Sequence, residues 1–274
     1  MLACFRCACV DSLEQSDRSS LEFMDSQDLI APGGNFPATR WSVVAAVRSG
    51  DPNQRSRALD ALFIAYWKPV YKYIRLKYSK TPDESEDLTQ GFFIELLERD
   101  LLSRFDPQKS RLRTYMRLCV DSFVLNEIKH ASRLKRGGDV RHLALDFPAA
   151  EGELAVQTID PASIRSPDRF EEFFEKEWIR SLFSAAVEDL KTICAERNRQ
   201  TAFALFDAYD LAETDGVSYS KLAAAHNITI SEVTNQMAWA RREFRCAAQR
   251  RLRELCSSDE EYLREARMLF GGGG

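Results

Sequence analysis

The chain has 274 residues, 45% of them hydrophobic and 29% charged, with a formal net charge of −4. These proportions are ordinary for a soluble globular protein, and no apolar run approaches the roughly 18–20 residues that span a bilayer, so no membrane association is expected. The net charge argues against a uniformly basic surface for nucleic acid. Charge is nevertheless uneven: residues 104–141 are basic, 146–177 are acidic, and 241–253 carry six arginines against one glutamate.

Residues 1–38 are expected to form an irregular leader. Its apolar, cysteine-rich start lacks the basic region and the cleavage site of a signal peptide. Cys4, Cys7 and Cys9 have no fourth ligand nearby that would complete a tetrahedral metal site, so neither a metal nor a cofactor is expected. Cysteines within apolar helical patterns, such as Cys119 and Cys194, indicate free thiols in a reducing compartment and therefore a cytoplasmic protein.

Residues 39–138 form the first predicted domain. Apolar side chains recur there every three or four residues, as on one face of a helix. The pattern predicts helices over about 39–49, 53–78 and 110–135, with a further helix that starts after Pro82. Pro69 is expected to kink or split the second of these helices.

A second domain is predicted over residues 168–258. It is preceded by an acidic linker, 139–167, which has three prolines and little periodicity, and it is followed by a tail, 259–274. No segment has the alternation typical of a strand. The predicted fold is therefore all-α, with two small helical domains joined by an acidic linker.

The C-terminal domain contains the pattern of a helix-turn-helix. Ser218 is expected to cap a short helix, Asn227 suits the turn that follows, and a second helix starts at Ser231. This second helix is expected to offer Ser231, Glu232, Thr234, Asn235, Ala238, Trp239 and Arg242 to the DNA major groove, while arginines that include Arg241 and Arg245 hold phosphates. The alternative is an ordinary helical hairpin with a basic, solvated face.

Several segments resemble a known family in their order along the chain. Residues 83–93 read Asp-Glu-Ser-Glu-Asp-Leu-Thr-Gln-Gly-Phe-Phe, which is similar to the acidic segment by which bacterial RNA polymerase sigma factors dock on the polymerase clamp helices. Residues 104–115 resemble the loop and helix entry that handle the minus-ten promoter element in that family. Residues 132–138 close the domain as in the extracytoplasmic-function (ECF) members, and 217–253 are similar to the segment that binds the minus-thirty-five element.

The resemblance implies a non-catalytic subunit that binds core RNA polymerase and directs promoter recognition and DNA melting. The implied polymerase-binding residues are Asp83, Glu86, Asp87 and Gln90. The implied DNA-binding residues of the first domain, with the basic ones along one side of a helix, are Lys109, Arg111, Arg113, Tyr115, Arg117, Lys129 and Arg133. For Tyr115, core packing is the favoured alternative to stacking on a base. The implied partners are core RNA polymerase, promoter DNA and an inhibitory anti-sigma factor.

Other classes of protein account for fewer of these features. A stand-alone helix-turn-helix regulator would bind its operator without polymerase, and a helical interaction protein would use its basic faces only for solvation. An enzyme is not expected, because the three histidines are scattered and neither a phosphate loop nor a nucleophile elbow is present. Gly91 departs from the family, which usually has glutamate at this position of the docking segment.

Overall fold

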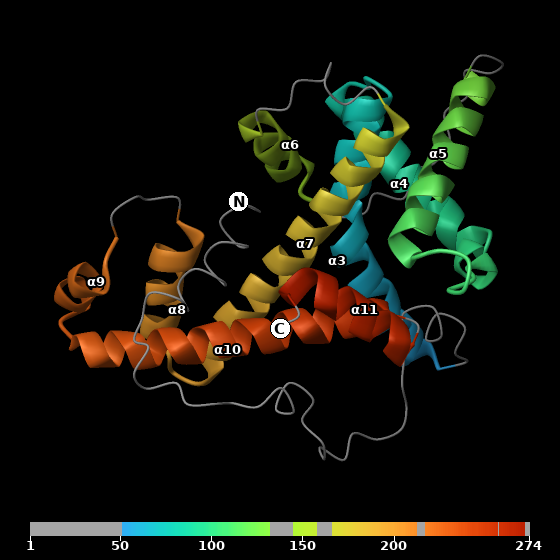
Figure 1. The fold of residues 1–274 in the computed structure, drawn as a ribbon. Coiled ribbons are helices and arrows are strands. Elements are labelled where there is room, and N and C mark those ends of the chain that lie inside the picture. The colour runs from blue at the N-terminus through green and yellow to red at the C-terminus, as the bar shows by residue number, and fades with distance from the viewer. Residues whose placement is uncertain (1–50, 132–144, 158–165, 213–216, 257, 272–274) are drawn as a thin grey trace. The chain divides into compact units, whose positions relative to one another are not determined.

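The computed structural model describes residues 51–131, 145–157, 166–212, 217–256 and 258–271. Every regular element in these ranges is a helix, which confirms the all-α prediction for the described part of the chain (Figure 1). The leader 1–38 and the helix expected over 39–49 lie outside the described residues.

The chain divides into two compact units. Of the described residues, 51–185 and 251–263 belong to what we call the N-terminal unit, and 186–250 and 264–271 belong to the C-terminal unit. The first division falls inside a helix, between Ala185 and Ala186, whereas the sequence favoured a boundary in the segment 139–167.

Helix α3 (Pro52–Lys77) carries much of the core of the N-terminal unit. The side chain of Asp51 accepts a hydrogen bond from the backbone N–H of Asn53 at 2.9 Å, and a proline at the first helical position suits this start. The sequence predicted that Pro69 would kink or split this helix. Pro69 lies buried within one continuous helix, so the split does not occur. Proline has no backbone N–H and therefore removes one hydrogen bond of the helix. Burial of Pro69 and its neighbours offsets that loss.

Two further helices pack with α3 in this unit. They are α4 (Pro82–Glu98) and α5 (Leu112–Ala131), and the short 3₁₀ helix η1 (Leu101–Arg104) lies between them in the chain. The start of α4 has a capping box in which Thr81 and Glu84 satisfy each other's backbone N–H groups.

Gly91 lies where α4 meets α5. A Cβ atom at this position would lie 3.1 Å from Cζ of Phe123, which is closer than ordinary van der Waals contact. Glycine therefore permits the close approach of the two helices at this position.

Helix α6 (Phe147–Val156) lies within the segment predicted as a linker and packs against α3 (Figure 1). The Phe147 ring lies 5.0 Å from the Tyr71 ring and 5.6 Å from that of Trp67, between centroids. The expectation of an irregular linker is thus wrong over these residues. The helix is short and presents one large aromatic residue, so its periodicity is weak.

The first half of helix α7 (Pro167–Glu196) also belongs to the N-terminal unit. Its Glu177 forms a buried ion pair with Lys72 of α3, with Nζ and Oε2 2.7 Å apart and both side chains 1% exposed. One residue further, Trp178 packs 6.4 Å from Tyr66, between ring centroids. These contacts anchor α7 on α3.

The C-terminal unit contains the second half of α7 and a series of shorter and longer helices. In chain order these are α8 (Gln200–Phe206), the π-helical turn η3 (Asp207–Leu211), α9 (Tyr219–His226), part of α10 (Ile230–Leu255) and part of α11 (Asp259–Phe270). Helix α11 occupies most of the segment predicted as a tail.

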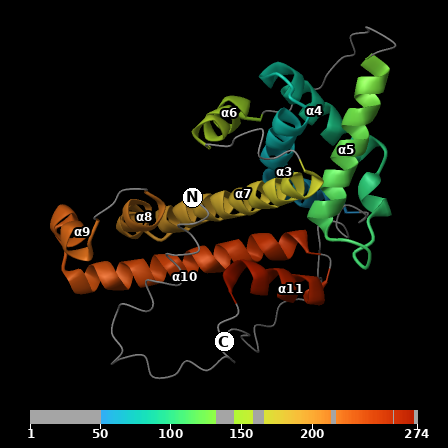
Figure 2. The ribbon, with the colours of Figure 1, turned by 45° about the horizontal axis from the view of Figure 1, so that its top comes forward.

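The connection from α9 to α10 is short (Figure 2). Ser218 caps α9 by accepting a hydrogen bond from the backbone N–H of Lys221. Asn227 then takes the left-handed conformation, with φ of 53°, which asparagine tolerates better than most residues. Both features agree with what the sequence predicted for this segment.

Candidate nucleic-acid interface

A basic pocket of about 310 Å³ lies at the start of α5, in the N-terminal unit. Its lining residues come from the loop before α5, from the first turns of α5 and from the first half of α7; they are Lys109, Ser110, Arg111, Arg113, Thr114, Arg117, Glu171, Phe174 and Glu175. Four of the predicted DNA-binding residues are thus brought together here: Lys109, Arg111, Arg113 and Arg117.

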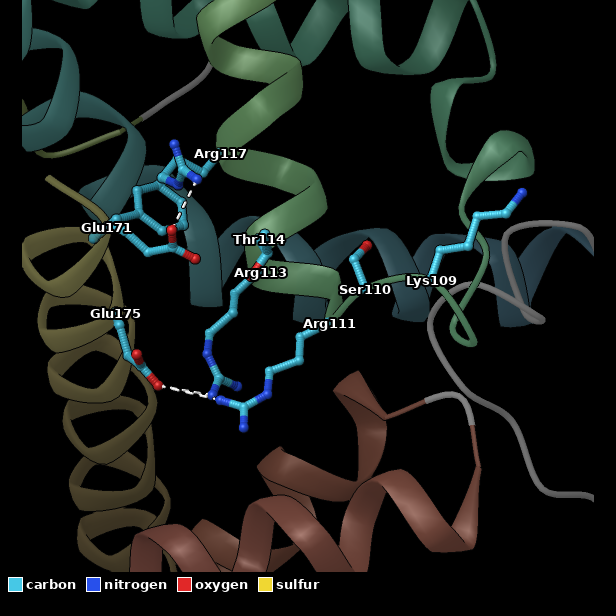
Figure 3. Close-up of a pocket in the computed structure, with 9 residues that line it drawn as sticks. Lys109, Ser110, Arg111, Arg113, Thr114, Arg117, Glu171 and Glu175 are labelled. Atoms are coloured by element: carbon cyan, nitrogen blue, oxygen red, sulfur yellow. Dashed lines mark hydrogen bonds and ion pairs between the residues drawn. The ribbon is translucent and has the colours of Figure 1, made fainter. Parts of the chain in front are cut away.

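Carboxylates of α7 neutralise the arginines of this pocket (Figure 3). Glu175 lies 2.8 Å from Arg113 and 3.6 Å from Arg111, measured between guanidinium nitrogen and Oε1. Glu171 lies 3.2 Å from Arg117, between Nη2 and Oε2. The sequence shows that this segment is acidic, but it does not reveal that these glutamates face the basic residues.

The basic residues do not line one side of α5, and that prediction is wrong. Arg113 is 5% exposed, and its guanidinium lies 4.9 Å from the centre of the Trp178 ring. Arg111 precedes the helix, whereas Lys129 is exposed near its far end. Successive residues advance by about 100° around a helix, so Arg117 and Lys129 point in different directions. Arg133 lies outside the described residues.

Tyr115 packs into the protein. This is the core packing that the sequence favoured over stacking on a base. Its ring lies 5.4 Å from that of Phe105, between centroids, and its hydroxyl donates a hydrogen bond to the Leu101 carbonyl at 2.6 Å. Burial raises the pKa of this hydroxyl to about 12, with a further contribution from Cys119. Tyr115 therefore has a structural role in joining α5 to η1.

The acidic edge predicted for polymerase docking is only partly exposed. Asp83 and Asp87 are exposed on α4, and Glu86 is half-buried. Gln90 is 1% exposed, and its amide donates a hydrogen bond to Glu86 at 3.2 Å, so its expected place on the partner surface is wrong. Helix α4 packs against both α3 and α5, and this wider contact covers more of its circumference than a single apolar stripe.

The long helix α10 has a sharp division between buried and exposed side chains in the C-terminal unit. Its buried residues mostly recur at helical spacing, and they are Val233, Met237, Trp239, Ala240, Phe244, Ala247 and Ala248. The exposed residues include most of those predicted to face outward, namely Ser231, Glu232, Thr234, Asn235, Ala238, Arg242 and Arg245.

The start of α10 is held by a reciprocal cap. The hydroxyl of Thr229 accepts a hydrogen bond from the backbone N–H of Glu232, and the Glu232 carboxylate accepts one from the backbone N–H of Thr229 at 2.7 Å. This bond, with a second from the Thr229 hydroxyl, lowers the pKa of Glu232. Because one carboxylate oxygen of Glu232 accepts both of these bonds, it is less available to contact a base than the sequence predicted.

Two residues of α10 predicted to bind DNA point into the protein instead. Trp239 is 8% exposed and lies under the Arg199 guanidinium, 4.5 Å from the ring centre, so its outward placement is wrong. Arg241 makes two hydrogen bonds to Asp210, at 2.8 and 2.9 Å. Burial would lower the pKa of Arg241, but the bonds to Asp210 raise it overall. Arg241 therefore joins α10 to η3.

No cluster of side chains suited to a metal ion, and no helix long and apolar enough to cross a membrane, is found in the described part of the chain. The cysteine group at residues 4–9 lies outside it. Comparison with protein-family models, with curated proteins and with solved structures finds no match to this chain. The family resemblance of the motifs therefore stays a prediction.

Proposed function

We propose that this protein is a sigma factor of the ECF type, which binds core RNA polymerase and directs it to promoters. The observation that carries the proposal is the arrangement of α9 and α10. A short capped helix, a turn through a left-handed Asn227 and a long helix with one buried and one polar face are the features expected of a helix-turn-helix, and they support this proposal.

The polar face of α10 suits the DNA major groove. Ser231, Thr234 and Asn235 lie exposed within the first turns, where a recognition helix contacts base edges. Arg242 and Arg245 are exposed two to three turns further along and can bind phosphates. This helix would serve the minus-thirty-five element.

The N-terminal unit supplies the two other functions in the proposal. Asp83 and Asp87 give α4 an exposed acidic edge for the polymerase. The pocket at the start of α5 concentrates cationic groups, with Lys109 the most exposed of them, and such grooves bind the backbone of single-stranded DNA. This pocket would hold the non-template strand of the melted promoter.

Co-elution with core RNA polymerase in gel filtration tests the proposal. The wild-type protein is expected to co-elute with the core enzyme, and Asp87→Lys is expected to weaken the complex because it reverses a charge at the docking edge. Asp60→Lys is the matched control, since Asp60 is an exposed aspartate of α3 outside that edge. Failure of the wild-type protein to co-elute would refute the proposal.

Promoter binding by the complex tests the part assigned to α10. Arg242→Ala is expected to weaken binding and to reduce the salt slope by about one unit, which is the effect of losing one phosphate contact. Arg250→Ala, which removes another exposed arginine of the same helix, serves as the control. Tight binding to palindromic DNA without polymerase would instead favour a stand-alone regulator.

A further inference from the structure

The cationic pocket of the N-terminal unit already has an anionic occupant in this structure. The first turns of α7 carry the carboxylates Glu171 and Glu175, which pair with arginines on and before α5. We propose that these two glutamates compete with DNA phosphates for Arg111 and Arg117, so that α7 restrains the DNA-binding site of its own unit. The inference rests on the proposed function, because it concerns the regulation of that same pocket.

The chemistry of the contacts supports competition. A guanidinium group binds carboxylate and phosphate oxygens through the same planar set of N–H donors. When Glu171 and Glu175 hold Arg117 and Arg111, the donors directed at these glutamates are not available to a phosphate. An incoming strand must therefore displace the carboxylates before it gains those contacts.

The burial of each ion pair indicates which groups can move. The Glu171 and Glu175 side chains are 48% and 32% exposed, and ion pairs in contact with solvent are weak and easily exchanged. Glu177, which lies less than one turn after Glu175, is buried with Lys72. Helix α7 can therefore stay anchored through Glu177 while its two exposed carboxylates release the pocket.

Arg113 is not part of the exchange. Its side chain is almost fully buried and lies against Trp178, so it holds α5 to α7 in either state. Arg111 and Arg117 form the exchangeable pairs. Arg111 is 38% exposed and lies 3.6 Å from Glu175, a longer contact than the one Glu175 makes with Arg113. Arg117 is mostly buried, but its Nη2 pairs with the half-exposed Glu171 while its Nη1 stays with Asp121.

The test measures binding of the full-length protein to a short, fluorescent, single-stranded oligonucleotide by anisotropy at low salt. The double variant Glu171→Gln, Glu175→Gln removes two competing charges with little change of shape. We expect it to bind roughly tenfold more tightly than the wild type, which corresponds to the loss of two weak ion pairs. The single variant Glu171→Gln should give a smaller gain in the same direction.

The matched control is the double variant Asp168→Asn, Glu172→Gln. It changes the net charge equally on exposed residues of the same helix that do not line the pocket. Because the control variant has two fewer negative charges, its general electrostatic attraction for the oligonucleotide should tighten binding by less than about threefold. An equal gain from this control and from the pocket variant would overturn the inference, as would unchanged affinity of the pocket variant.

A second arm locates the effect. Arg111→Ala added to the pocket variant should remove most of its gain in affinity, and a gain that persists would contradict the assignment of the pocket. Far-ultraviolet circular dichroism and thermal melting verify that each variant is folded. If polymerase co-elution fails while the glutamate variants still raise oligonucleotide affinity, the proposed function falls alone. If the wild-type protein directs transcription and the glutamate variants leave affinity unchanged, only the present inference falls.

Discussion

The buried ion pair between α3 and α7 offers the sharpest test of how the N-terminal unit is held together. Lys72 Nζ lies 2.7 Å from Glu177 and 2.8 Å from the partly exposed Glu153 of α6. Replacing Lys72 with methionine removes the charge and keeps most of the side-chain volume. Glu177 would then keep only Arg180 among the basic partners identified for it, on its own helix.

The expected cost of this substitution follows from burial. Removing one partner of a buried ion pair costs about 3–5 kcal/mol, because the remaining charge is left without compensation. Arg180 compensates Glu177 in part, so we expect Lys72→Met to lower the free energy of unfolding by about 3 kcal/mol. Adding Glu177→Gln removes the stranded charge, and the double variant should lose less than the sum of the two single effects by about 2 kcal/mol.

Urea denaturation followed by circular dichroism gives these free energies, and hydrogen exchange assigns the loss to α3 and α7. Lys68→Met is the matched control, because Lys68 also pairs with Glu153 but is much more exposed, and its loss should cost under about 1 kcal/mol. Equal effects of Lys72→Met and Lys68→Met, or strictly additive effects in the double variant, would refute the reasoning.

Three further predictions test local features of the fold. Gly91→Ala should lower stability in urea by about 1 kcal/mol, because crowding against Phe123 outweighs the gain in helix propensity, and a more stable variant would contradict this. Asn227→Ala should lower the melting temperature through left-handed strain of roughly 1 kcal/mol, whereas Asn227→Gly should not. The hydrogen bond from Arg75 lowers the pKa of Glu151, so the contact of α6 with α3 stabilises the fold above the ordinary pKa of about 4.3 and loses this contribution as pH falls through the lowered value. Near-ultraviolet circular dichroism during acid titration should reveal that loss, and Glu151→Gln should remove it.

The helices themselves were largely predictable from the sequence. Helix α3 begins and ends within one residue of its predicted bounds. Helix α9 has the expected Ser218 cap at its start and the expected Asn227 conformation at its end. These features depend on side chains a few residues apart, such as a cap or an apolar stripe. Local patterns of this kind are visible in a single sequence.

The direction of individual side chains was harder to predict, because it depends on partners far along the chain. Trp239 is covered by Arg199, and Arg241 pairs with Asp210, 31 residues earlier. Arg113 likewise turns toward a distant partner, Trp178 of α7. A stripe of polar residues on one helix cannot reveal which of them meets a neighbouring helix.

The features that the sequence does not reveal are short or depend on distant contacts. Helix α6 is held by aromatic and ionic contacts with α3, which lies about eighty residues earlier in the chain. The pairing of Glu171 and Glu175 with arginines of α5 had one signal in the sequence, the alternation of basic and acidic segments. That alternation indicated complementary charge without identifying which residues would meet.

The most direct test of the proposed function is transcription in vitro from genomic fragments with core RNA polymerase, with and without the protein. We predict that the protein adds discrete transcripts whose start sites share two upstream sequence elements, and that Arg242→Ala reduces these transcripts. A set of transcripts identical to that of the core enzyme alone would contradict the proposal.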